Sequence, residues 1–101
     1  MSKTTIRQLV TIITEAALES ELTRQLERLG ARGYTITEAR GKGSHGLRDA
    51  GWDEMRNLRL EVICEEYVAE RIMDYLQEHY YDNFAMVVFC SEIRVHRHDK
   101  F

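Results

Sequence analysis

The sequence predicts an α+β domain in which two βαβ units form one antiparallel sheet with both helices on the same face. Three observations predict it: β-branched apolar runs, two stretches with helical apolar spacing, and the order in which these alternate along the 101 residues. That order, strand, helix, strand, long loop, strand, helix, strand, is that of the ferredoxin-like βαββαβ fold. A chain of this length is expected to form a single domain, residues 1–101.

The first half of the chain supplies two strands and a helix. Residues 6–13 are rich in β-branched apolar side chains and predict the first strand. Leucines recur every three or four positions from about Leu18 to Leu29 with charged residues between them, which predicts an amphipathic helix that Gly30 ends. Residues 34–40 alternate between polar and apolar side chains and predict a half-buried strand.

The second half repeats this pattern after a segment with little apolar periodicity. The expected elements are a long loop over 41–56, a strand over about 57–64, a helix over about 67–80, a turn at 82–83 and a strand over 84–90, with an extension of that strand through Ile93 and Val95 left open. The loop therefore joins the second and third strands.

The face of the sheet that the helices leave bare is also predicted to be apolar. Residues 85–90 are apolar throughout, and the run from Leu9 to Ile13 is interrupted only by Thr11. Because no residues are left over to cover this face, we expect copies of the chain to bury it in a closed symmetric oligomer.

Composition excludes several classes of protein. No apolar run approaches the roughly 20 residues that a membrane-spanning helix needs, and the start of the chain does not resemble a signal peptide, so we expect a cytoplasmic protein. The net charge of −3 argues against general nucleic-acid binding. Cys64 and Cys90 lie in apolar surroundings without a metal-site spacing, which favours buried thiols over a disulfide or a metal site.

The glycine-rich segment that follows the second predicted strand suggests anion binding. Gly41 and Gly43 let the backbone approach a ligand closely, while Lys42, Ser44 and Arg48 supply two cations and a hydroxyl. A phosphate group fits these donors best. The segment lacks the spacing of a P-loop, and an ordinary flexible turn is the alternative interpretation.

Two segments carry a family resemblance. Residues 29–43, LGARGYTITEARGKG, are similar to the PII signature in which a helix end is followed by Gly-x-x-Gly-x-Thr-Val-Thr-Glu-Val-Lys-Gly-x-Gly. The chain thus resembles the PII signalling superfamily over nearly its whole length. Residues 41–44 with Arg48, and residues 80–91, YYDNFAMVVFCS, resemble the SbtB-type and carboxysome-associated PII-like proteins of inorganic-carbon metabolism.

This resemblance implies a homotrimeric, non-enzymatic sensor without a metal cofactor. An adenine nucleotide (AMP, ADP or cyclic AMP) would bind in the cleft between subunits, and bicarbonate could bind beside it. The segment 41–56, the T-loop of the family, would then act on a protein target, a transporter or an enzyme of carbon metabolism. Membrane association is expected only through such a partner.

Departures from the classical PII pattern refine this expectation. Asp82, Asn83 and Phe84 stand where classical members have a glycine- and lysine-rich phosphate loop, which favours a nucleotide with one or two phosphates. His45 stands where classical members have a glutamine that helps to bind 2-oxoglutarate, and the loop has no tyrosine to modify. A classical nitrogen regulator therefore remains an alternative only.

The resemblance also implies roles for individual residues. The expected nucleotide contacts are Thr35, Gly41, Lys42, Gly43, Ser44, Arg48, Ile63, Val87, Arg94 and Arg97. Gly41 to Arg48 would hold phosphate, and Ile63 and the backbone around Val87 would border the adenine. Glu61 matches a family glutamate on the adenine side. Thr35 could equally be an ordinary strand residue, and Arg94 and Arg97 could belong to a solvated basic tail.

Other functional interpretations remain open. Trp52 and Asp53 suggest a partner contact in the T-loop, with packing of Trp52 against the protein itself as the alternative. A metal-binding trimer of the same architecture would use His45, His96 and His98. No catalytic residues stand at a recognisable spacing, so we expect no enzyme, and an RNA-binding sheet would need exposed aromatic residues and a basic surface.

Overall fold

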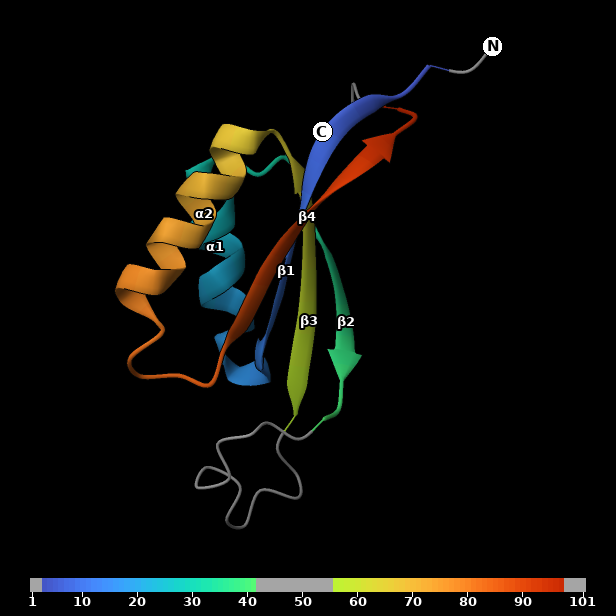
Figure 1. The fold of residues 1–101 in the computed structure, drawn as a ribbon. Helices are drawn as coiled ribbons and strands as arrows, with labels where there is room; N and C mark the ends of the chain where they lie inside the picture. The colour runs from blue at the N-terminus through green and yellow to red at the C-terminus, as the bar shows by residue number, and fades with distance from the viewer. Residues whose placement is uncertain (1–2, 42–55, 98–101) are drawn as a thin grey trace.

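The computed structural model describes residues 3–41 and 56–97 and has the predicted ferredoxin-like α+β architecture (Figure 1). Its elements are β1 (Thr5–Glu15), η1 (Ala16–Leu18), α1 (Glu19–Leu29), β2 (Thr35–Ala39), β3 (Asn57–Cys64), α2 (Glu66–His79) and β4 (Val87–Val95). None of the helices in the described ranges is long and apolar enough to cross a membrane.

The four strands form one antiparallel sheet in the order β2-β3-β1-β4, and both helices cover the same face (Figure 1). Ile12 of β1 lies opposite Leu60 of β3 and Val88 of β4, so these three side chains point to the helices. The core between sheet and helices is formed by Val10, Ile12, Leu22, Leu26, Leu60, Val62, Ile72 and Leu76, all at most 1% exposed. Burial of this apolar surface is the main force that holds the layers together.

Gly30 ends α1 as the sequence predicts. Its φ of 113° lies in the left-handed region, which other residues rarely adopt. Its N–H donates to the carbonyls of the last helical turn, and a Cβ at this position would lie 3.3 Å from Cγ2 of Val68. Glycine therefore brings the end of α1 close to the start of α2.

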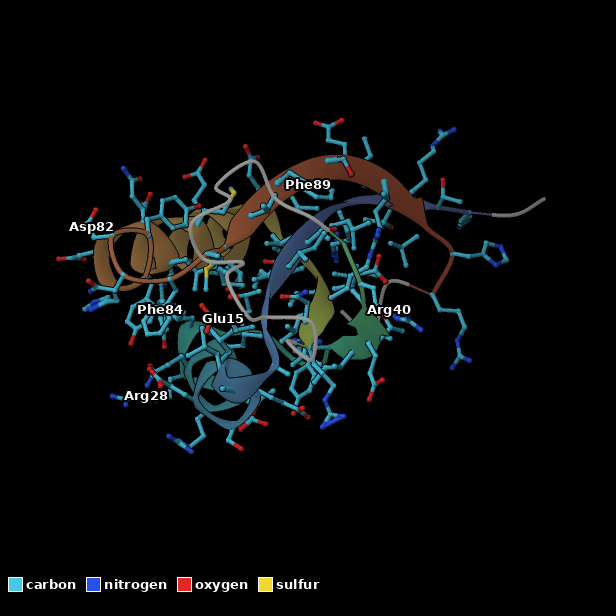
Figure 2. The ribbon with its side chains drawn as sticks, turned by 90° about the horizontal axis from the view of Figure 1, so that it is seen from below. Glu15, Arg28, Arg40, Asp82, Phe84 and Phe89 are labelled. Carbon is cyan, nitrogen blue, oxygen red and sulfur yellow. The ribbon has the colours of Figure 1, made fainter. Side chains whose placement is uncertain are left out.

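The predicted bounds of the last strand are wrong at its beginning. β4 begins at Val87 instead of residue 84 and continues to Val95. Phe84 donates its N–H to the carbonyl of Tyr80 and packs its ring 5.6 Å from the ring of Tyr80. Figure 2 shows Phe84 on the side of the helices. Residues 84–86 therefore form a corner after α2, in which Phe84 is partly buried against the core.

The sheet face away from the helices is called the open face here. It is formed by Leu9, Thr11, Ile13, Arg59, Glu61, Ile63, Val87, Phe89 and Ile93, which alternate with the residues that point to the helices. Val87 and Phe89 remain 56% and 47% exposed. The expectation that both faces of the sheet carry large apolar side chains is therefore confirmed.

Candidate functional site

The T-loop leaves and re-enters the sheet at one end. Ala39 of β2, Asn57 of β3 and Glu15 of β1 lie in one row across the strands there. Ala16 donates its N–H to the carbonyl of Arg56 at 2.9 Å, which ties the end of the loop to the corner after β1. Gly41 is exposed just beyond the end of β2.

Most of the predicted phosphate contacts follow directly on Gly41. Figure 2 shows Arg40 beside the end of β2. Lys42, Gly43, Ser44 and Arg48, together with the predicted partner contacts Trp52 and Asp53, lie outside the described residues. For these residues, the structure fixes only the positions of Gly41 and Arg56, which flank them in the chain.

A polar row crosses the open face. Thr35 of β2, Glu61 of β3 and Thr11 of β1 are directly opposite one another. Glu61 accepts a hydrogen bond from Nε of Arg59 at 3.3 Å and lies 3.2 Å from its Nη2. The hydroxyl of Thr11 is fully buried and has no partner within residues 3–41 and 56–97. The structure thus brings Thr35 and Glu61 side by side.

Ile63 lies near the opposite end of β3 and lines a small pocket of about 60 Å³. The pocket lies between the end of α1, the end of β3 and the start of α2, and it is lined by Gly30, Arg32, Ile63, Cys64, Glu65, Tyr67 and Val68. Sequence reasoning identified only Ile63 of this group. Tyr67 could have been identified from the sequence, because it is an aromatic residue at the start of a helix and lies outside the apolar stripe of that helix.

Val87 does not meet Ile63 within one chain. Val87 lies opposite Ile13, whereas Ile63 lies opposite Leu9 on the other side of β1. Four residues along a strand correspond to about 13 Å, and two strand spacings add about 10 Å across the sheet. The two predicted adenine contacts are therefore separate surfaces of one chain.

Arg94 and Arg97 lie far from Gly41 in the same chain. Arg94 is opposite Ile6, near the start of β1, whereas the T-loop begins beyond the row that contains Glu15. The nine residue steps from Ile6 to Glu15 span about 30 Å. The end of β4 and the end of β2, after which the T-loop begins, are accordingly at opposite ends of the sheet in Figure 1.

The corner between α2 and β4 offers few free amides to a phosphate. The N–H groups of Asn83 and Phe84 both donate to the carbonyl of Tyr80 at 3.0 Å, and the N–H of Tyr81 donates to Leu76 at 3.3 Å. The hydroxyl of Thr14 donates to the carbonyl of Ala85 at 3.1 Å. Since Thr14 precedes Glu15, this closed corner lies at the T-loop end of the sheet.

Tyr80 holds this corner against α1. Its hydroxyl donates to Oε2 of Glu21 at 2.6 Å, while its ring is almost fully buried. Burial, followed by the hydrogen bond to Glu21, raises the pKa of Tyr80 above its ordinary value of 10.0. The pair was not found from the sequence, because its two members are 59 residues apart.

Both cysteines are free thiols; Cys64 is buried as predicted, whereas Cys90 is only half-buried. Burial raises the pKa of the Cys64 thiol from 9.0 to about 11. Among residues 3–41 and 56–97, no three histidine, cysteine or acidic side chains gather in a way that could hold a metal ion. His45 and His98, two of the three ligands in the metal-binding alternative, lie outside these ranges.

Comparison with known proteins identifies the family. The sequence profile of the nitrogen regulatory protein P-II family matches residues 7–100, so the chain belongs to the P-II family. A crystal structure from Thermus thermophilus, described as a PII-like signaling protein, is 43% identical, with 98% of each chain covered and a TM-score of 0.83.

Two structures of CPII from Thiomonas intermedia K12 are also similar. The structure bound to ADP and bicarbonate is 29% identical, covers 100% of this chain and 99% of its own, and has a TM-score of 0.85. The structure bound to ADP, AMP and bicarbonate is 28% identical, with 100% and 98% coverage and a TM-score of 0.85. The prediction of a PII-like branch is confirmed by these similarities.

Proposed function

We propose that this protein is a PII-like signalling protein that binds AMP, ADP or cyclic AMP between copies of the chain and catalyses no reaction. The observation that carries the proposal is the distribution of the expected contacts over a single chain. Gly41, Ile63, Val87 and Arg94 lie on separate ends or strands of the sheet. A site that uses all of them needs more than one copy.

The open face supplies the reason for copies to associate. Val87 and Phe89 are large, apolar and about half exposed, and an apolar surface of this kind is a typical subunit interface. We infer a homotrimer in which each copy is one domain of residues 1–101. One copy would contribute Thr35 and Ile63, and the next would contribute Val87 and the T-loop start from Gly41 to Arg48. Arg94 and Arg97 would reach phosphates that are held by Gly41 to Arg48 of one copy only if they come from a different copy.

The closed corner after α2 favours a nucleotide with few phosphates. The amides of Tyr81, Asn83 and Phe84 already donate to carbonyls of the chain, and Asp82 adds a negative charge. An additional outer phosphate would therefore find no amide cradle in this corner. AMP and ADP fit this arrangement better than ATP, and ADP is bound in both CPII structures.

Bicarbonate is a second candidate ligand. It is a small anion suited to the same glycine amides and cations that would hold phosphate, and it is bound together with ADP in the structure of CPII. This supports a role in inorganic-carbon metabolism, which we propose for a cytoplasmic protein. The T-loop, with Trp52 and Asp53, would carry the signal to a transporter or an enzyme, because a ligand that binds one loop conformation better shifts the population toward it.

Isothermal titration calorimetry with AMP, ADP, cyclic AMP and ATP, with and without bicarbonate, tests this function. We expect binding of AMP or ADP to be tighter than binding of ATP, and Arg48→Ala to weaken it. Arg28→Ala, which removes an exposed arginine from α1, is the matched control and should bind as the wild type does. Absence of binding by all four nucleotides at millimolar concentration would overturn the proposal.

A classical nitrogen regulator is the second candidate, because the matching family profile is that of the nitrogen regulatory protein P-II. Addition of 2-oxoglutarate to the same titrations separates the two. An ATP complex that strengthens with 2-oxoglutarate would favour the nitrogen regulator, and indifference to 2-oxoglutarate would favour the PII-like sensor.

A further inference from the structure

Building on the nucleotide binding proposed above, we propose that the pocket at the junction of β3 and α2 holds the purine base. In this assignment the ring of Tyr67 stacks on the base, and the carboxylate of Glu65 accepts a hydrogen bond from its exocyclic amino group. Tyr67 and Glu65 would thereby select adenine over bases that carry a carbonyl group at the same position.

The pocket has an aromatic and an aliphatic wall. Tyr67 is 61% exposed although α2 has a well-filled apolar stripe, so its ring is not needed in the core. Ile63, which is half-buried, also lines the pocket and supplies the aliphatic surface. A flat ring held between an aromatic and an aliphatic side chain loses apolar surface on both faces, and stacking on an aromatic side chain is a common means of holding a base.

The polar groups of the pocket favour a base over a phosphate. Glu65 lines it and carries a negative charge, which repels phosphate. A carboxylate only accepts hydrogen bonds when ionised, so it matches the amino group of adenine and opposes the carbonyl oxygen of hypoxanthine or guanine. Arg32 also lines the pocket and is exposed. Its positive charge offsets the negative charge of Glu65.

A second arginine keeps the Glu65 carboxylate in place. Nη2 of Arg7 lies 3.9 Å from Oε2 of Glu65, and the Arg7 side chain is only 15% exposed. Nη1 of Arg7 also donates to the carbonyl of Ile6 at 3.0 Å, which restricts the guanidinium. A cation at this distance limits the movement of the carboxylate, as a group that must distinguish two bases requires.

The pocket is too small to enclose a whole purine base, so the base would lie at its mouth. A volume of about 60 Å³ admits one edge of a base, so the remainder must be covered by another surface. Ile63 lies level with Leu9, and Gly41 lies beyond the row of Glu15, about 20 Å along the sheet. The phosphates of the same nucleotide must therefore be held by the T-loop start of a neighbouring copy.

Calorimetry with ADP and inosine 5′-diphosphate tests the assignment on the full chain. We expect Tyr67→Ala to weaken ADP binding by about tenfold or more and Tyr67→Phe to retain it within about twofold, because the stacking surface is kept. Wild-type protein should prefer ADP to inosine 5′-diphosphate, and Glu65→Gln should abolish that preference, because an amide can donate as well as accept.

The matched control is Tyr81→Ala, which removes another exposed tyrosine at the far end of α2 and should bind ADP as the wild type does. Circular dichroism and the molecular mass in solution establish that each variant is folded and assembled. If Tyr67→Ala does not fold, Tyr67→Leu takes its place, because leucine keeps the apolar volume but offers no aromatic face.

The outcomes separate this inference from the proposed function. Unchanged ADP affinity in the Tyr67 variants, together with weakened binding in Arg48→Ala, would overturn the base pocket and leave the nucleotide sensor intact. Equal affinity of the wild type for ADP and inosine 5′-diphosphate would overturn the role of Glu65. Failure of wild-type protein to bind either nucleotide would overturn the proposed function itself.

Discussion

Replacement of Phe89 tests the link between the open face and nucleotide binding. Phe89 lies opposite Thr11 on β4, points away from the helices and is 47% exposed. A phenylalanine buries roughly 200 Å² when fully covered, so about 95 Å² remains to be buried by another copy. At about 25 cal/mol per Å², this is about 2 kcal/mol for each interface, or about 30-fold in association constant.

Phe89→Ala should therefore weaken assembly by about that factor, and Phe89→Glu should weaken it further because a carboxylate would be buried without a partner. Sedimentation velocity over a range of protein concentrations measures the assembly, and calorimetry with ADP measures the site. Both should fail together in Phe89→Glu. Arg28→Glu, which adds the same carboxylate at an exposed position of α1, should remain assembled and bind ADP.

Two results would refute this reasoning in different ways. A Phe89→Glu protein with the wild-type mass at every concentration would mean that the open face is not the subunit interface. A monomeric Phe89→Glu protein with wild-type affinity for ADP would mean that one chain suffices for the site. The second result would also contradict the assignment of Ile63 and Gly41 to different copies of one site.

Three further predictions concern stability. Tyr80→Phe should lower the free energy of unfolding by about 1–2 kcal/mol, because it removes the 2.6 Å hydrogen bond to Glu21; an unchanged denaturation midpoint would contradict this. Thr11→Val should raise that free energy by about 1 kcal/mol, because the buried hydroxyl has no partner in the described part of the chain; a loss of stability would reveal a bond to a neighbouring copy or to another residue. The pKa of Cys64 is raised from 9.0 to about 11, so its contribution to stability is fully present below pH 9 and is lost as the pH rises toward 11. Between about pH 8 and about pH 10.5 the wild type should lose about 2 kcal/mol more than Cys64→Ala does, as measured by urea denaturation; parallel pH profiles would contradict the shift.

Local patterns predicted most elements well. The alternation of Leu58, Leu60 and Val62 gave β3 with the bounds that the structure shows, because a period of two is visible in any strand with one buried face. The start of β4 was predicted wrongly. An apolar run such as residues 84–86 suits a strand and a packed corner equally, and the choice depended on the carbonyl of Tyr80, which accepts the N–H of Phe84.

The candidate site was predictable only in part. The resemblance of residues 29–43 to the PII signature pointed to Thr35 and Gly41, and its extension along the chain to Ile63. It did not point to Glu65 or Tyr67, because a pocket between the ends of α1 and β3 and the start of α2 is formed by residues distant in the sequence.

The sequence by itself determined the order of the elements and which side chains can be buried, since both follow from periodicities between near neighbours in the chain. Only the tertiary structure decided which of the predicted site residues lie close to one another. Strand order and register depend on hydrogen bonds between distant segments, and they place Arg94 beside Ile6 and the end of β2 at Ala39 at the opposite end of the sheet. For that physical reason, the nucleotide site proposed here would need parts from neighbouring copies of the chain.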